Sequence, residues 1–156
     1  MTRATWRTAS MLVSIIASPT MAAPGFAPGQ WQHQTTLLTA NVPGVPQWII
    51  KMMAGHGMRE SCATPALLGS HPETLLQGDD TAICKTRTFT LSSGKLTYDT
   101  FCTNKRFPAG LLVASRGSYT PLSYTISTIS TGTKNGSPVR IETRGTGNRI
   151  SATCKG

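Results

Sequence analysis

The sequence has few acidic residues, and this scarcity excludes several kinds of site. Six Asp and Glu stand against fifteen Lys and Arg, which gives a formal net charge of +9. Asp79 and Asp80 are neighbours, but no third acidic residue is near, so a solvated turn is favoured over a calcium site. The histidines, His33, His56 and His71, lie far from the cysteines, and no two cysteines have the two-residue gap of a zinc or redox motif.

The motifs of common enzymes are also missing. No serine lies in a Gly-x-Ser-x-Gly elbow, and the chain has no glycine-rich phosphate loop. His56 and Glu60 are four residues apart, but Gly55 and Gly57 argue against a shared helix face. No nucleophile with its base, no pair of carboxylates and no metal site can be assembled from the sequence. We therefore expect no enzyme activity, no metal and no cofactor.

Long apolar runs are scarce, and the run near the N-terminus has the layout of a secretory signal peptide. Two arginines precede the apolar stretch MLVSIIA, which is too short to span a bilayer, and small residues follow it. Cleavage is expected after Ala22 or Ala23. We expect residues 1–22 to be removed and residues 23–156 to form one β-rich domain. This domain is expected to be a periplasmic or secreted monomer without an integral membrane segment.

All four cysteines lie beyond the expected cleavage point: Cys62, Cys84, Cys102 and Cys154. An even number of cysteines in an oxidising compartment predicts two disulfides, although spacing alone leaves three pairings open. Residues 84–102, CKTRTFTLSSGKLTYDTFC, favour one of the three. A hairpin with a three-residue loop of Ser92, Ser93 and Gly94 sets partners so that their numbers sum to 186. That register pairs Arg87 with Asp99, Thr86 with Thr100, and Cys84 with Cys102. We therefore expect Cys84 to bond Cys102 and Cys62 to bond Cys154.

Period-two alternation continues to the end of the chain and predicts a sheet. One face carries Leu111, Val113, Ser115, Gly117 and Tyr119, and the next carries Leu122, Tyr124, Ile126 and Thr128. The turn signal Asn135-Gly136 then leads to Val139, Ile141 and Thr143. Residues 145–148 break the alternation, as a bulge or as a tight turn, so that Ile150 becomes the next inward residue. With a strand near Trp31, this makes about six strands.

The predicted fold class is therefore mainly β. We expect a single antiparallel sheet, strongly curved or closed into a small barrel, with one or two short helical segments and two disulfides. Thr64 and Pro65 are typical of a helix start, as N-cap and first helical residue.

One segment, Pro46 to Met58, is apolar without alternation. Its large side chains are candidates for ligand contact or for a cover: Trp48, Ile49, Ile50, Met52, Met53 and Met58. Either the segment covers an open end or edge of the sheet and completes its core, or it is a movable lid over an apolar ligand site. Flexible methionines suit a lid, and Gly55 and Gly57 could be its hinges.

Three arginines, Arg116, Arg140 and Arg144, project away from the apolar set on neighbouring strands and are candidates for one basic face. Such a face would attract anionic lipid or glycan of the cell envelope. The alternative is that the positive charge only supports solubility. The charges are scattered and lack interleaved aromatics, which does not favour nucleic acid as a partner.

Several landmarks occur together in an order that resembles a known family. They are Pro28-Gly29-Gln30-Trp31, Cys62-Ala63-Thr64-Pro65, Cys84, the Ser93-Gly94 turn with Cys102 beyond it, and Asn148-Arg149-Ile150 followed by Cys154. The sequence resembles the DUF3617 family, small exported bacterial proteins of uncharacterised function. Ala63 stands where the family has leucine or a similar residue, and residues 151–153 lack its glycine. The resemblance implies a periplasmic four-cysteine β-domain and no particular chemistry.

Two functional hypotheses follow. The first is a binding module whose concave face holds an apolar or lipid-like small molecule. The second is an envelope structural or interaction protein that meets an anionic envelope component through its basic face. A cavity lined by Tyr98, Val113, Tyr124 and Ile141 would favour the first, and a solid core would favour the second.

Overall fold

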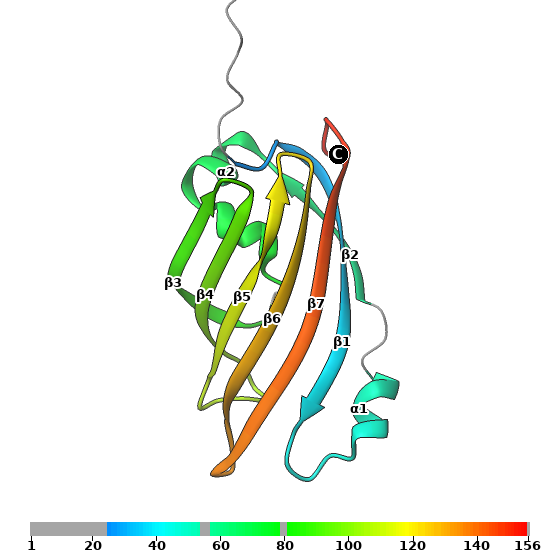
Figure 1. Cartoon of the computed structure of the whole chain (residues 1–156), viewed down its shortest axis with the longest axis vertical. Coiled ribbons are helices and arrows are strands. Elements are labelled where there is room, and N and C mark those ends of the chain that lie inside the picture. Colours follow the sequence, from blue (N-terminus) through cyan, green and yellow to red (C-terminus); the bar gives the residue numbers. More distant parts are fainter. Residues whose placement is uncertain (1–24, 54–56, 79–80, 156) are drawn as a thin grey trace, which may run out of the picture.

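The computed structural model of the protein describes residues 25–53, 57–78 and 81–155 (Figure 1). The expected signal peptide, residues 1–22, lies outside the described residues, as do Gly55, His56, Asp79 and Asp80. In the described part, no helix is long and apolar enough to cross a membrane.

The main element is one antiparallel sheet of seven strands within the described residues. The strands are β1 (Gly29–Asn41), β2 (Gly57–Ala63), β3 (Ile83–Ser92), β4 (Lys95–Thr103), β5 (Leu111–Thr120), β6 (Ser123–Lys134) and β7 (Ser137–Ser151). They lie in the order β2-β1-β7-β6-β5-β4-β3. Figure 1 shows the sheet curled into a half-barrel, with β2 and β3 as its edges. The predicted single, strongly curved antiparallel sheet is confirmed, and the half-barrel is open.

The β3–β4 hairpin has a tighter turn than the sequence suggested. Ser93 and Gly94 alone form the loop, with φ of 49° and 75°, and Ser92 faces Lys95. Two central residues with positive φ are typical of the type I′ turn, whose twist matches that of antiparallel strands. The predicted three-residue loop is therefore wrong.

A β-bulge between Thr86 and Thr88 then shifts the register by one residue, so that Thr86 faces Thr100 as predicted. Asp99 faces Thr88, so the predicted pairing of Asp99 with Arg87 is wrong.

On the side of the bulge away from the turn, Cys84 faces Cys102 and the two form a disulfide. Cys62 and Cys154 form the second disulfide, which links β2 to the segment after β7. Both disulfides have the predicted pairing.

The β6–β7 hairpin has the predicted tight turn. Asn135 and Gly136 have φ of 52° and 77°, and Lys134 faces Ser137. The pairing then continues without a shift from Lys134 to Ser123, so the predicted bulge or turn at residues 145–148 is wrong.

Strand β7 keeps its alternation through residues 145–148 because glycines replace side chains on its inward face, and its pairing with β1 shifts register only outside this range. Gly147 lies opposite Tyr124, and a Cβ on Gly147 would lie 2.1 Å from Cε1 of the tyrosine ring. The tyrosine ring thus fills the space that a side chain at residue 147 would need. Ile150, which was expected to face inward, is 46% exposed.

Three short helical segments accompany the described strands: α1 (Gln47–Met53), α2 (Pro65–Ser70) and the 3₁₀ segment η1 (Pro72–Leu76). Thr64 caps α2 as predicted, since its hydroxyl accepts a 3.1 Å hydrogen bond from the backbone N–H of Leu67. The expected apolar segment 46–58 is divided between α1 and β2, and β2 is a strand that the sequence did not predict.

The hydrophobic core lies on the concave side at the end of the half-barrel near α2 (Figure 1). Leu75 of η1 is 2% exposed and packs in the same cluster as Trp31 and Leu96, which are 0% and 1% exposed. The Trp31 indole N–H donates a 3.0 Å hydrogen bond to the carbonyl of Ala27. Phe26 packs edge-on against Trp31. Because α2 and η1 are short, they close only this end of the concave face, and the rest holds the candidate site.

Candidate functional site

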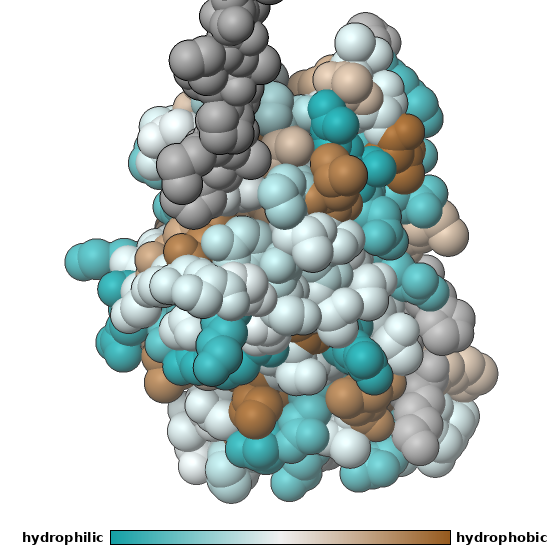
Figure 2. All heavy atoms as spheres, turned by 45° about the horizontal axis from the view of Figure 1, so that its top comes forward, coloured by the Kyte–Doolittle hydropathy of each residue, from teal (hydrophilic) through white to brown (hydrophobic). Residues whose placement is uncertain are grey.

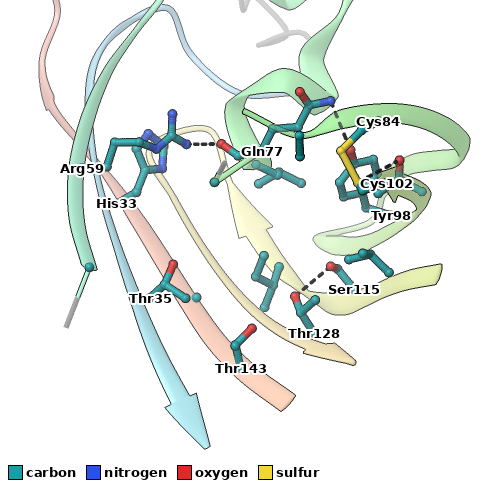
Figure 3. A pocket seen from close by; sticks show the side chains of 18 of the residues that line it. His33, Thr35, Arg59, Gln77, Cys84, Tyr98, Cys102, Ser115, Thr128 and Thr143 are labelled. Atoms are coloured by element: carbon teal, nitrogen blue, oxygen red, sulfur yellow. Dashed lines mark hydrogen bonds between the residues drawn. A yellow bond between two sulfur atoms is a disulfide. The ribbon is translucent and has the colours of Figure 1, made fainter. Parts of the chain in front are cut away.

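A cavity of about 670 Å³ lies on the concave face beside the core. All seven described strands contribute to its lining, together with residues 76–78 at the end of η1 (Figure 3). Tyr98, Val113 and Tyr124 line it, as the binding hypothesis required, whereas Ile141 is not among its lining residues.

The floor of the cavity alternates between apolar and hydroxyl-bearing rows. Thr143, Thr128 and Ser115 face each other across β7, β6 and β5, and the hydroxyls of Ser115 and Thr128 are 2.8 Å apart (Figure 3). From this row of hydroxyls, the next inward residue toward the core is Ile126 of β6, and the next one away from the core is Val113 of β5. A ligand that lies along the strands, followed from the core end, would therefore meet hydrocarbon first and then hydroxyl groups.

His33 of β1 lies at the core end of the cavity and is 4% exposed. Its Nδ1 is 2.8 Å from the Tyr124 hydroxyl and its Nε2 is 2.7 Å from the Ser61 hydroxyl. Burial, with a smaller contribution from the positive charge of Arg59, lowers the pKa of His33 from 6.5 to about 4. The imidazole is therefore neutral at pH 7, and both ring nitrogens already have partners.

Tyr124 is held in its neutral form as well. Burial raises the pKa of its phenol to about 12, and the nearby charge of Arg59 opposes the shift. Tyr124 also stacks on Trp31, with ring centroids 6.3 Å apart. His33 and Tyr124 thus join the cavity wall to the core through neutral hydrogen bonds.

Arg59 of β2 faces His33 across the β1–β2 pair and also lines the cavity. Its Nη2 donates hydrogen bonds to the carbonyls of Gln77 and Leu75, and Figure 3 shows it reaching toward Gln77. The Gln77 side chain donates to the Tyr98 hydroxyl at 3.3 Å. Arg59 thus connects the edge strand β2 to the segment that follows η1. The sequence presented Arg59 as one of many scattered charges, and no local pattern marks it.

The predicted cover segment is placed away from the cavity. Trp48 and Met52 of α1 are 65% and 70% exposed, and Figure 1 shows α1 near the far end of β1. Of the six candidate side chains, Met58 lines the cavity, and it belongs to β2. Ile49 and Ile50 are partly buried, and the side chain of Met53 lies outside the described residues. The expectation that Trp48 completes the core is wrong, because α1 projects from the sheet rather than onto it.

The three arginines of the predicted basic face are placed on the convex side. Arg116 and Arg144 flank Ser127 from the two neighbouring strands. Arg116 forms an ion pair with Asp99, and Arg140 forms one with Glu142 at 2.8 Å. Neighbouring carboxylates therefore offset two of the three positive charges.

Exposed apolar side chains come from separate elements: Leu38, Trp48, Met52, Met58, Ile83, Leu112, Leu122, Ile129 and Ile150. On the face shown in Figure 2, brown residues are separated by paler and teal ones. Scattered apolar residues of this kind are normal on a protein surface. No group of three His, Cys, Asp or Glu in the described part could hold a metal ion.

Comparison with known proteins places the chain in a family. The family described as "Protein of unknown function (DUF3617)" matches residues 26–154, from Phe26 of the core to the last cysteine. No curated protein and no solved structure gives a significant match. The matched range includes every strand of the sheet and both disulfides. The chain therefore belongs to the DUF3617 family of proteins of unknown function.

Proposed function

We propose that this protein is a non-catalytic binding module that holds an apolar or lipid-like small molecule in the concave cavity of its half-barrel. The observation that carries the proposal is the cavity of about 670 Å³ beside a well-packed core. Ligand pockets of proteins commonly have volumes of about 300–1,000 Å³ and an apolar lining with a few polar groups. The alternating apolar and hydroxyl rows of the floor fit that description.

The two disulfides support a role outside the cytoplasm. Disulfides persist in oxidising compartments, and this chain ties both margins of its sheet with them. We propose that the protein acts as a monomer in the periplasm or after secretion. Contact with anionic lipid or glycan through the convex face is the second proposal. The ion pairs of Arg116 and Arg140 weaken it, because they offset the charge that would attract the partner.

A pair of substitutions on β5 tests the binding proposal. Val113 lines the cavity, whereas its neighbour Leu112 is 39% exposed on the opposite face of the same strand. Val113→Trp should fill the cavity and lower the affinity for an apolar fluorescent probe, N-phenyl-1-naphthylamine, by about tenfold or more. Leu112→Trp adds the same side chain to the convex face and should leave probe binding unchanged.

Circular dichroism and thermal melting must show that both variants are folded. Equal probe binding by the two variants would remove the cavity as the binding site. Native mass spectrometry of protein purified from its own envelope then identifies the molecule that co-purifies.

A further inference from the structure

Of the described residues that line the cavity, Arg59 differs from the others in carrying a formal charge. The other described lining residues are uncharged at pH 7, because burial keeps His33 neutral and Tyr124 protonated. A cation beside an apolar floor has lost part of its hydration, so an anion that reaches it is bound more strongly than it would be in water.

The acidic residues that the structure places have other partners. Glu60 lies 2.7 Å from the Lys155 amine, Asp99 pairs with Arg116, and Glu142 pairs with Arg140. Glu73 lies 3.5 Å from His71. Among the described residues, no carboxylate lies within 4 Å of Arg59, whose partners are the two backbone carbonyls. Both of those bonds use Nη2, and no other described residue is a hydrogen-bond partner of Nε or Nη1, so both atoms can donate to a ligand.

The position of Arg59 also gives the ligand a direction. Arg59 and His33 lie at the core end of the cavity, and Ser115, Thr128 and Thr143 lie further along the strands (Figure 3). On β5, Val113 lies six positions before Tyr119, which faces Tyr124. At about 3.4 Å per residue this is a length of about 20 Å. A head group at Arg59 can therefore be followed by an extended chain over Ile126 and Val113.

We propose that the cavity takes a single-chain amphiphile with an anionic oxygen head group, a carboxylate or a phosphate, and that Arg59 binds the head while the chain lies along the floor. This inference rests on the proposed binding function and names its ligand class. A planar guanidinium binds carboxylate and phosphate oxygens through paired N–H donors, and an alcohol head offers no charge for it.

The test measures displacement of the naphthylamine probe by three ligands with the same chain: dodecanoate, dodecyl phosphate and dodecanol. The parent protein should bind at least one of the two anions about tenfold or more tightly than dodecanol. The stronger of the two identifies the source of the head group, a fatty acid or a phosphate ester. Arg59→Gln should lose this preference and bind dodecanol as the parent does.

Arg144→Gln is the matched control, since it removes an exposed cation from the convex face and should keep the preference. Arg59→Lys is the second variant, because Arg59 also holds the carbonyls of Leu75 and Gln77. It retains the charge without the paired donors and should weaken anion binding several-fold.

The outcomes separate the two proposals. If the folded parent does not bind the probe, the binding function itself fails. If it binds the probe and none of the three ligands displaces it, the proposed ligand class is overturned and the cavity remains a binding site. If dodecanol binds as tightly as both anions, or if Arg144→Gln loses the preference as Arg59→Gln does, the role of Arg59 is overturned and the cavity remains a binding site.

Discussion

His33 should make the protein less stable as the pH falls from neutral toward 5. Its pKa is about 4 in the folded protein and about 6.5 when the chain is unfolded. The unfolded chain therefore takes up a proton on this imidazole as the pH falls through 6.5, whereas the folded protein does not until about pH 4. Because the unfolded state binds more protons in this window, acid favours unfolding there.

The size of the effect follows from the two pKa values. Between pH 7 and pH 5, linkage gives a loss of about 2 kcal/mol in the free energy of unfolding. We take this value as an upper limit, because the ring borders an open cavity. Glu60 adds little in this range, since the Lys155 amine lowers the pKa of its carboxyl below the usual value and its contribution is lost only in more acidic solution.

Urea unfolding at pH 7, 6 and 5 measures the effect, with the disulfides intact. His33→Gln keeps a polar side chain but removes the titrating group, so its stability should change by about 2 kcal/mol less than that of the parent over this range. If the parent and His33→Gln lose stability in parallel, the buried neutral state assigned to His33 is incorrect.

Three further substitutions test the fold. Gly147→Ala should lower the free energy of unfolding by about 1–3 kcal/mol, because the new Cβ meets the Tyr124 ring. Gly69→Ala is the control, since its Cβ has open space and should not destabilise the protein. Equal melting points for the two variants would contradict the packing at Gly147. Cys102→Ser should cost about 2–5 kcal/mol in urea unfolding, and a negligible loss would show that the disulfide contributes nothing. Trp48→Ala should change stability by less than about 0.5 kcal/mol, and a large drop would place this side chain in the core after all.

Features that depend on neighbouring residues could be predicted from the sequence. The Asn135-Gly136 turn, the Thr64 cap and the facing cysteines all rest on local chemistry, and the structure contains each of them. The hairpin register near Cys84 was correct because two deviations cancel. The loop is one residue shorter than expected, and the bulge at Arg87 restores the register.

Features that depend on distant residues could not be predicted. Strand β2 presents Gly57, Arg59, Ser61 and Ala63 on the concave face of the sheet, so it has no large apolar residue at alternate inward positions. In the sequence, Gly147 suggests a break in a strand. The structure shows instead that the ring of Tyr124 fills the space beside this glycine. The role of Arg59 depends on β2, and it becomes visible only when β2 pairs with β1 and brings the guanidinium to the cavity.

The position of β7 has a consequence for how the protein is made. This last strand lies between β1 and β6 and so joins a two-stranded piece, β1 with β2, to the four-stranded meander β3–β6. The meander can form from local hairpins while the chain is still being synthesised, but β1 waits for a partner more than a hundred residues away. Cys62 waits with it for Cys154, at a sequence separation of 92. Until the C-terminal strand arrives, the indole of Trp31 has no completed core to enter. The nascent chain then has one unpaired strand edge on each side of the gap that β7 will fill, on β1 and on β6.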